Sequence, residues 1–354
     1  MGQLSISGEA KKPASRRMNQ LTFGLNRRPF ATIPGFVESV RREEALGFDY
    51  AWIPDSQMRR PDAFILAALA LQGTSRIHVG PLLSNPVTRH PTTIANAAAT
   101  LGMLAPGRAA VGIGAGDTAV FTVGLRPAKV REVGEALLVV KSLLGGGAPD
   151  FGARRAVRLK TEGSAELWGA ASGPRAARAA GAAADVIVLR CGVHPANLNR
   201  LADAAEQGAR AAGRNPAELR FGAIVHTLIH EDPARAQAEA RLVGAGFYEI
   251  SAALWQEAGL EWNGPPVHEI AAQVYPDIVH AEDVTGAARL TGFVREEAAR
   301  AFALSGDERA VAAGLDRVVR GFPRLWHVIP QPLDWTPDFP DRVTTVRRLL
   351  SLER

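Results

Sequence analysis

The sequence predicts an α/β fold, a (β/α)8 TIM barrel that carries a helical insertion before its last barrel unit. Strand-like and helix-like segments alternate from residue 20 to the end of the chain, which is typical of a parallel sheet with helical crossovers. Eight strands that alternate with helices describe a closed barrel better than an open sheet. Residues 246–304 are too long for an ordinary connection, and we interpret them as the insertion.

The predicted strands are short apolar runs that end in Gly, Pro or small polar residues, as buried parallel strands do. In chain order they cover residues 21–25, 50–54, 77–83, 109–113, 166–171, 186–190, 219–229 and 324–329. The predicted helices carry apolar residues at helical spacing, and several begin near a Pro, which is favoured in the first helical turn. They cover residues 34–46, 61–72, 91–104, 127–144, 174–180, 195–212, 233–243, 307–321 and 339–352.

The chain reads as one domain behind a short tail. Residues 1–19 are polar and lack the apolar centre of an export signal, so they indicate a disordered N-terminal tail. Residues 20–354 then form a single barrel domain, with the insertion at 246–304 on its catalytic side. No apolar run reaches the length of a membrane span. We therefore expect a cytoplasmic protein with no membrane partner.

Charge and cysteine content exclude several kinds of site. The net charge is +5, but the Arg residues are spread along helices without interleaved aromatic residues, so no nucleic-acid partner is expected. A small polyanion is the better-motivated partner. Cys191 is the one cysteine, which excludes an intramolecular disulfide and a cysteine-based zinc site. His226 and His230 share one face of a predicted strand and could touch a ligand, but no metal site is expected.

Two neighbouring strand ends point to a ligand site. Residues 79–91 read VGPLLSNPVTRHP and residues 111–117 read VGIGAGD, with a predicted helix between them. The carboxyl ends of parallel strands face one edge of the sheet, where α/β proteins bind ligands. The glycines at 112–116 look like part of a dinucleotide fingerprint, but no suitably spaced acidic residue comes after a following strand. A Rossmann fold is therefore not supported.

These residues resemble the luciferase-like family, in particular its coenzyme F420-dependent branch, typified by methylenetetrahydromethanopterin reductase. The resemblance covers about residues 20–350 and is supported by segments 23–25, 44–49, 52–55, 172–174, 184–188 and 305–308. It implies an oxidoreductase that binds reduced F420 and passes a hydride to a C=N or C=C bond of a small molecule, natural product or peptide. An FMN-dependent monooxygenase is the alternative, and a barrel without cofactor that acts as a binding subunit is the second.

The resemblance places the cofactor ring over the strand ends, against a bulge with a cis peptide bond between Leu82 and Leu83. Ring binding is assigned to these two residues and to Asp55, Ser84, Asn85, Gly114 and Gly116. Small residues at two later helix starts indicate phosphate binding, because backbone N–H groups and helix ends favour anions. These residues are Gly169, Ser172 and Gly173 in one loop and Gly192 and Val193 in the next.

Asp117, Asp55 and Asn26 are the predicted catalytic residues. Asp117 follows three small residues, and its carboxyl would donate a proton to substrate if burial raises its pKa; the alternative is a helix cap. Asp55 would bond to the ring or the substrate, or cap its loop. Asn26 stands where the methanopterin reductases carry a Glu. Because Asn cannot act as an acid, this difference argues against the methanopterin substrate, while the amide could still orient a substrate carbonyl.

The sequence leaves the substrate open. Arg27 and Arg28 would contact a substrate carboxylate or remain solvated. The aromatic residues of the insertion either wall a pocket for a bulky or peptidic substrate or form the insertion's own core; these are Phe247, Tyr248, Trp255, Trp262 and Tyr275. Barrels of this family commonly pair, so we expect a homodimer. The strong preference for Arg over Lys indicates a GC-rich actinobacterial genome.

Overall fold

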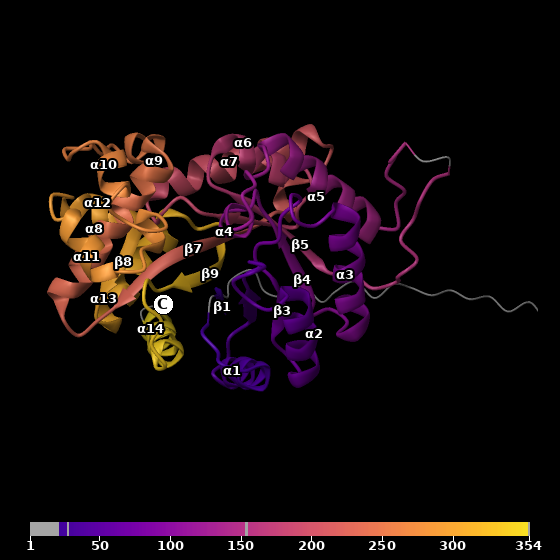
Figure 1. Ribbon diagram of the computed structural model, residues 1–354, viewed down its shortest axis with the longest axis horizontal. Coiled ribbons are helices and arrows are strands. Elements are labelled where there is room, and N and C mark those ends of the chain that lie inside the picture. The colour runs from indigo at the N-terminus through magenta and orange to yellow at the C-terminus, as the bar shows by residue number, and fades with distance from the viewer. Residues whose placement is uncertain (1–20, 27, 153–154, 353–354) are drawn as a thin grey trace, which may run out of the picture.

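The computed structural model describes residues 21–26, 28–152 and 155–352, so the predicted tail at 1–19 lies outside the described residues. Parallel strands occupy the centre of the molecule and helices surround them (Figure 1). The strand order is β3-β2-β1-β9-β7-β6-β5-β4, and isolated bridges from Val79 to Ala109 and from Ser84 to Ile113 join the two ends. The predicted TIM barrel is therefore confirmed.

Most observed elements lie within a few residues of the predicted ones. The barrel strands are β1 (Thr22–Leu25), β2 (Tyr50–Ile53), β3 (His78–Pro81), β4 (Ala110–Ile113), β5 (Glu166–Ala171), β6 (Val186–Leu189), β7 (Arg220–Ile229) and β9 (Leu325–Gln331). The helices around them are α1 (Ile33–Ala45), α2 (Ala63–Gly73), α3 (Pro91–Leu104), α5 (Val130–Leu144), α6 (Pro174–Gly181), α7 (Pro195–Ala211), α13 (Glu308–Gly321) and α14 (Phe339–Leu352). Two short helices, α4 (Thr118–Phe121) and the 3₁₀ turn η1 (Pro216–Glu218), lie in connections.

An additional strand, β8 (Ala303–Gly306), was not predicted. It pairs with the second half of β7, from His226 to Ile229, beyond the point where Leu189 ends the pairing of β6 with β7. Strand β8 thus continues the sheet next to β7 after β6 has stopped. Its four residues lie at the edge of the segment read as a helical insertion and are too few to show a strand period.

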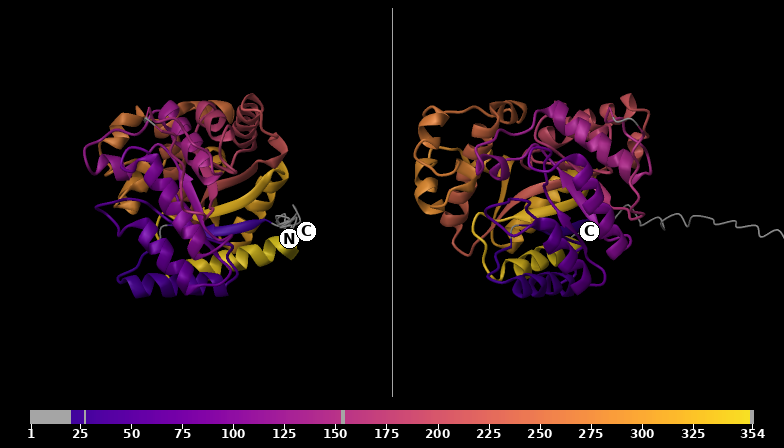
Figure 2. Two further views of the ribbon diagram at one scale, coloured as in Figure 1. Left: turned by 90° about the vertical axis from the view of Figure 1, so that its right-hand side faces the viewer. Right: turned by 45° about the vertical axis from the view of Figure 1, so that its right-hand side comes forward.

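The segment before β8 folds as short helices around one long helix, α8 (Pro233–Ile250), which runs seven residues beyond its predicted end at residue 243. The short elements are α9 (Ala252–Glu257), α10 (Val267–Ala271), η2 (Ile278–His280), α11 (Val284–Leu290) and α12 (Glu296–Phe302). All of them contact α8, and together they form a lobe beside the barrel (Figure 2).

The aromatic residues of this lobe pack mainly against one another. The rings of Tyr248 and Trp262 stack at 4.2 Å, and Trp255 is buried against Phe302. Tyr275 is exposed. The lobe therefore uses most of these side chains as its own core, which is the second of the two interpretations offered by the sequence.

Aromatic side chains also fill the amino end of the barrel. Tyr50 stacks on Trp52 with ring centroids 5.0 Å apart, and Trp168 meets Trp52 edge-on at 4.6 Å. The Tyr50 hydroxyl donates to a carboxylate oxygen of Glu166 at 2.9 Å. This packing leaves the carboxyl ends of the strands as the open side of the barrel interior.

His327 lies in the same cluster and is fully buried. Trp52 Nε1–H donates to His327 Nε2 at 3.2 Å. The Thr22 hydroxyl donates to the Trp326 carbonyl, so the 2.8 Å contact between Thr22 Oγ1 and His327 Nδ1 places a proton on Nδ1. Burial lowers the pKa of His327 well below its usual value, and the nearby His78, Arg220 and Arg347 add to the effect.

We expect this histidine to make the folded state sensitive to acid. In the unfolded chain His327 binds a proton near pH 6.5, whereas in the folded chain it stays neutral, so its contribution is complete above pH 6.5 and is lost as the pH falls. Between pH 6.5 and 5 the free energy of unfolding should fall through this residue by up to about 1.6 kcal/mol. Urea titrations at both pH values should show a smaller loss in His327→Gln, whereas His268→Gln in α10 should behave as the wild type. An equal loss in His327→Gln would refute the assignment.

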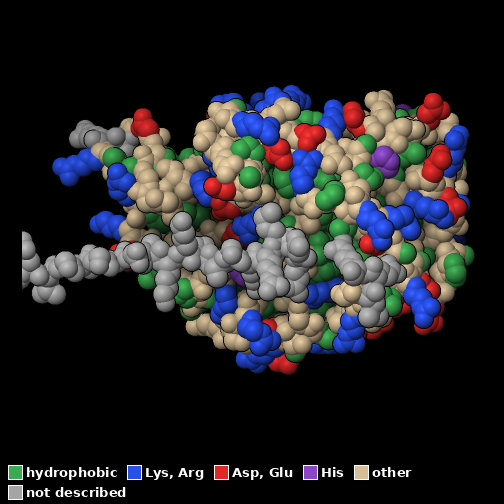
Figure 3. Space-filling model, turned by 180° about the vertical axis from the view of Figure 1, so that it is seen from behind, with side chains coloured by type: hydrophobic (Ala, Val, Ile, Leu, Met, Phe, Trp, Pro, Cys, Tyr) green, Lys and Arg blue, Asp and Glu red, His purple; other side chains and the backbone are tan. Residues whose placement is uncertain are grey.

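The surface shows no single dominant charge. On the face seen in Figure 3, Lys and Arg side chains alternate with Asp and Glu over much of the surface. Within the described ranges, no helix combines the length and the apolar character that a membrane span requires.

Candidate functional site

A cavity of about 670 Å³ opens at the carboxyl ends of the strands, a size suited to a cofactor or small ligand. It is bounded by side chains from the ends of the barrel strands and from the starts of α5, α6 and α7. Most of the predicted site residues line it: Asn26, Asp55, Leu82, Leu83, Asn85, Gly114, Gly116, Asp117, Ser172 and Gly173. The structure therefore brings the two strand ends of the sequence motif to one place.

The chain turns after β3 through a cis peptide bond between Leu82 and Leu83, as predicted, and we call these two residues the bulge. Asn26 Nδ2 donates to the Leu82 carbonyl at 3.3 Å, which ties the end of β1 to the bulge. A Cβ atom on Gly114 would lie 2.8 Å from the Leu83 side chain, so only Gly leaves Leu83 its place. The bulge and the glycines of β4 thus form one wall of the cavity.

Asn85 carries an unsatisfied donor on this wall. Its Oδ1 accepts hydrogen bonds from the backbone N–H groups of Val87 and Thr88 and from the Thr88 hydroxyl. Its Nδ2 is buried and has no hydrogen-bond partner among the described residues. Because a buried donor without an acceptor costs about 1–3 kcal/mol, a ligand acceptor at this atom would be stabilising.

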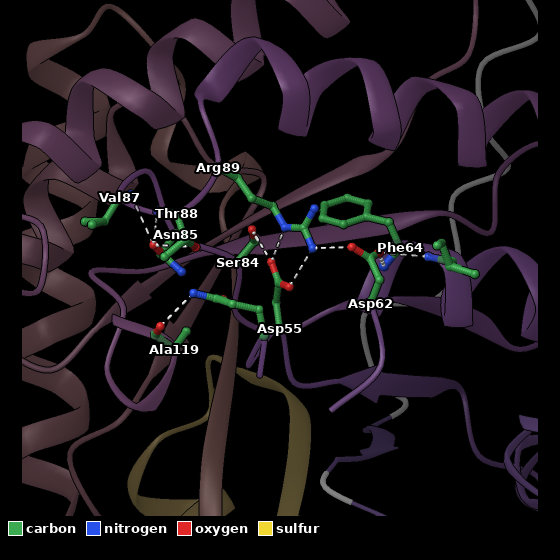
Figure 4. A network of polar contacts seen from close by, with 11 residues as sticks. Asp55, Asp62, Phe64, Ser84, Asn85, Val87, Thr88, Arg89 and Ala119 are labelled. Carbon is green, nitrogen blue, oxygen red and sulfur yellow. Dashed lines mark hydrogen bonds and ion pairs between the residues drawn. The ribbon is translucent and has the colours of Figure 1, made fainter. Parts of the chain in front are cut away.

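Asp55 is the centre of an ionic network (Figure 4). Arg89 binds both of its carboxylate oxygens, through Nε at 2.8 Å and Nη2 at 3.0 Å, and the Ser84 hydroxyl donates to Oδ2 at 2.7 Å. Arg89 also reaches Asp62, the N-cap of α2, at 2.6 Å and covers the Phe64 ring. The Asp55 side chain is only 1% exposed, so its charge is held in place by Arg89.

Asp117 both caps α4 and lines the cavity. One carboxylate oxygen accepts hydrogen bonds from the Thr118 backbone and hydroxyl, and the other lies 3.6 Å from Arg190 Nη1. The side chain is 43% exposed, so the burial expected for a proton donor is not found. The helix-cap interpretation of Asp117 is thus observed directly. The side chain also lines the cavity, as a proton donor would, but it lacks the burial that was expected to raise its pKa.

Four predicted cofactor residues do not line the cavity. Ser84 lies behind it, bonded to Asp55. A Cβ on Gly169 would meet Ala180 and Ala184, so this glycine permits close helix packing instead of phosphate contact. Gly192 packs against Phe302, and the Val193 N–H donates to the Ala301 carbonyl at 2.9 Å. These contacts engage the loop after β6 in packing, and phosphate binding by Gly169, Gly192 and Val193 stays a prediction that the cavity lining does not support.

The cavity also contains polar residues that the sequence did not single out. These are Ser56, Thr118, Arg175, Arg190, Arg200 and Gln331. Arg190 and Gln331 stand at the carboxyl ends of β6 and β9, and Arg175 lies in the first turn of α6. A polar residue at the carboxyl end of a predicted strand could have indicated the site. Arg190 is such a residue, but the sequence analysis assigned it only to the strand at 186–190. Arg190 lies 3.6 Å from Asp117 and Arg200 lies 2.6 Å from Glu257, so Arg175 at the start of α6 is the guanidinium best placed for an anion.

Several residues that the sequence analysis considered for a site lie outside the cavity. Arg28 is buried in an ion pair with Glu43 and is neither solvated nor in the cavity, while Arg27 lies outside the described residues. Cys191 is buried and desolvation raises the pKa of its thiol, so it is not a nucleophile. His226 contacts Gln331, whereas His230 pairs with Glu239. Over the described ranges, no three His, Cys, Asp or Glu side chains gather as a metal site would require.

The sequence profile of the luciferase-like monooxygenase family matches residues 16–324. A 5,10-methylenetetrahydromethanopterin reductase of Methanopyrus kandleri is 29% identical over 338 residues, which cover 86% of this chain and 94% of the relative. An F420-dependent hydroxymycolic acid dehydrogenase of Mycobacterium tuberculosis is 31% identical, with 64% and 67% of the two chains covered.

Solved structures show the same fold. The coenzyme F420-dependent tetrahydromethanopterin reductase from Methanopyrus kandleri superposes with a TM-score of 0.72 at 23% identity, over 94% of this chain and 99% of that one. An F420-dependent secondary alcohol dehydrogenase in complex with an F420-acetone adduct gives 0.67 at 20% identity, with 94% and 99% covered. With the family profile matched over most of its length, the chain belongs to the luciferase-like monooxygenase family.

Proposed function

We propose that this protein is an F420-dependent oxidoreductase that reduces a C=N or C=C bond of a small-molecule or natural-product substrate. Two kinds of observation support the proposal. Curated relatives across most of the chain are F420-dependent by name or are methylenetetrahydromethanopterin reductases. Asn85 also lines the cavity, and its Nδ2 is a buried donor that lacks an acceptor. This unsatisfied atom is the single observation that carries the cofactor assignment.

The residues present fit a deazaflavin ring and its anionic tail. The Leu82–Leu83 bulge offers an apolar wall, and Asn85 Nδ2 would donate to a carbonyl at the ring edge. Ser172 and Gly173 precede α6, whose N-terminus together with Arg175 would hold a phosphate. Reduced F420, when bound, supplies a hydride; the protein supplies orientation and charge.

Asp117 is the proposed site of proton transfer. Its half-exposed carboxylate can exchange protons with water at the mouth of the cavity, and Arg190 holds it at 3.6 Å. Asp55, by contrast, is fixed by Arg89 and is proposed to place a negative charge beside the ring. Asn26 bonds to the Leu82 carbonyl, so its proposed role is to position the bulge as well as a substrate carbonyl. A homodimer and a cytoplasmic location stay predictions.

Fluorescence titration tests the cofactor directly. We expect the protein to quench F420 fluorescence on binding, and a protein that bound FMN but not F420 would be a monooxygenase candidate instead. Binding of neither cofactor would favour the non-catalytic barrel.

Asn85→Asp isolates the role of the unsatisfied donor. Asp keeps the oxygen that accepts from Val87 and Thr88, so the turn should fold, but it replaces the Nδ2 donor by an acceptor. F420 affinity should fall roughly 10- to 100-fold, because one hydrogen bond is lost and the new carboxylate oxygen would face the ring carbonyl oxygen and repel it. Asn96→Asp, on the exposed face of α3, adds the same charge as a control and should bind F420 as the wild type does. Unchanged affinity in Asn85→Asp would remove the main support for the cofactor site.

A further inference from the structure

A compact loop borders the cavity at the carboxyl end of β4. The Ala128 N–H donates to the Ala115 carbonyl at 2.8 Å, which closes the ends of the segment from residue 115 to residue 128. Inside it, the Leu125 N–H donates to the Val120 carbonyl at 2.9 Å. Loops of this length with joined ends are often functional. We call this segment, which includes α4, the β4 loop; its residues 115–119 line the cavity.

The β4 loop and its neighbour expose apolar side chains close in sequence to residues that line the cavity. Gln57 Nε2 donates to the Ala119 carbonyl at 2.7 Å, which holds the loop after β2 against the β4 loop. Met58, the next residue, is 80% exposed, and Phe121 is 62% exposed. We define the apolar rim as Met58, Phe121, Val123, Leu125 and Val130, all of which are exposed large hydrophobic residues. Val130 also lines the cavity itself, so the rim and the cavity are continuous.

Met58 is held in an unusual backbone conformation. Its φ is +68°, and it is the only residue other than Gly with a positive φ in the described part of the chain. The N–H groups of Arg59 and Arg60 both donate to the Ser56 carbonyl and fix this turn. A long side chain in the left-handed region costs of order 1 kcal/mol relative to Gly, and such cost is concentrated at functional sites.

Cationic side chains outnumber carboxylates around the rim. Arg59, Arg126 and Lys129 are exposed beside the apolar rim. The nearby carboxylates already have partners: Asp117 lies 3.6 Å from Arg190, and Glu132 accepts from the Lys129 backbone N–H at 2.7 Å. The rim therefore combines apolar surface with positive charge, which is the complement of an anionic amphiphile.

We propose that the substrate is an anionic amphiphile whose apolar chain lies along the rim while its reactive end enters the cavity. This inference rests on the proposed function, because it names the substrate class of the same site. One molecule can occupy both regions, since the rim residue Val130 also lines the cavity and Ala119, two residues before the rim residue Phe121, lines it too. A protein partner or a bilayer would cover the rim without filling the cavity.

Straight-chain carboxylates of six, eight and ten carbons serve as probes below their micelle concentrations. Calorimetric titration of the full-length chain, with and without F420, should show affinity rising roughly threefold per methylene. Decyltrimethylammonium, which has the opposite charge, should bind at least tenfold more weakly than decanoate. Affinity that is independent of chain length, or stronger binding of the cation, would overturn the proposal. Binding to phosphatidylglycerol vesicles without binding of decanoate would also overturn it and would indicate a membrane surface.

Two variants locate the binding on the rim. Phe121→Ser/Leu125→Ser should weaken decanoate binding about tenfold and hexanoate binding less than threefold, while Leu138→Ser, an exposed leucine of α5, should change neither. Met58→Gly should raise the melting temperature because the left-handed φ suits Gly, yet weaken decanoate binding. Wild-type decanoate binding in both rim variants would refute the proposal. F420 quenching should stay unchanged in all three variants, so a failure of F420 binding in the wild type would count against the proposed function alone.

Discussion

Replacing Arg28 by Met should lower the free energy of unfolding by about 3–5 kcal/mol, which is the usual cost of removing one partner of a buried ion pair. The Arg28 and Glu43 side chains are only 3% and 2% exposed, with Nη2 and Oε2 2.7 Å apart. The same guanidinium donates to the carbonyls of Leu25 and Trp52 at 2.8 Å each. The substitution therefore leaves the buried Glu43 carboxylate and two backbone carbonyls, near the ends of β1 and β2, without their hydrogen-bond donor.

Urea denaturation measures this effect, and a double variant identifies its cause. Arg28→Met/Glu43→Leu should recover at least half of the loss, because it removes the uncompensated charge and leaves apolar side chains of similar volume. Arg131→Met breaks an exposed pair with Glu135 on α5 and should cost about 0.5 kcal/mol or less. A loss below 1 kcal/mol in Arg28→Met would show that water relieves Glu43.

Arg28 also illustrates why the sequence predicted the fold better than the contacts. The barrel strands are apolar runs that can be recognised locally, and all eight were placed within two residues of both observed ends. The pairing of Arg28 with Glu43 depends on how α1 packs across the strand ends, and no local pattern encodes that packing. Two adjacent arginines after a strand therefore read as solvated charge, whereas one of them is buried.

In the candidate site, too, residues within a local sequence motif were predicted, whereas residues that only the folded barrel brings together were missed. The bulge and Asn85 were found because a continuous motif contains them, and the cis bond at Leu82–Leu83 followed from resemblance. Gly169 and Gly192 were assigned to phosphate because a glycine that permits close packing looks the same in sequence as one that exposes N–H groups. Arg190 and Arg200 were missed because they come from β6 and α7, and only the closed barrel brings them to the cavity.

The network around Asp55 gives the second large expected effect. Arg89→Met should destabilise the protein by about 3–5 kcal/mol, because it leaves the Asp55 carboxylate buried with only the Ser84 hydroxyl as a donor. Asp62 loses the same partner but keeps the backbone donors of α2, so its share should be small. The loss should thus be concentrated at the cavity wall.

The dependence on pH separates a stranded charge from lost packing against Phe64. Protonation relieves an unpaired buried carboxylate, so Arg89→Met should regain stability relative to the wild type as the pH falls from 7 towards 4. Asp55→Asn/Arg89→Met should recover much of the loss at pH 7 and lose the pH-dependent gain, because Asn carries no charge while its amide oxygen can still accept from Ser84. Urea titrations of the three proteins at both pH values measure these differences. A deficit in Arg89→Met that does not change with pH would mean that Arg89 acts through its contact with Phe64, and that Asp55 is not a fixed charge beside the cavity.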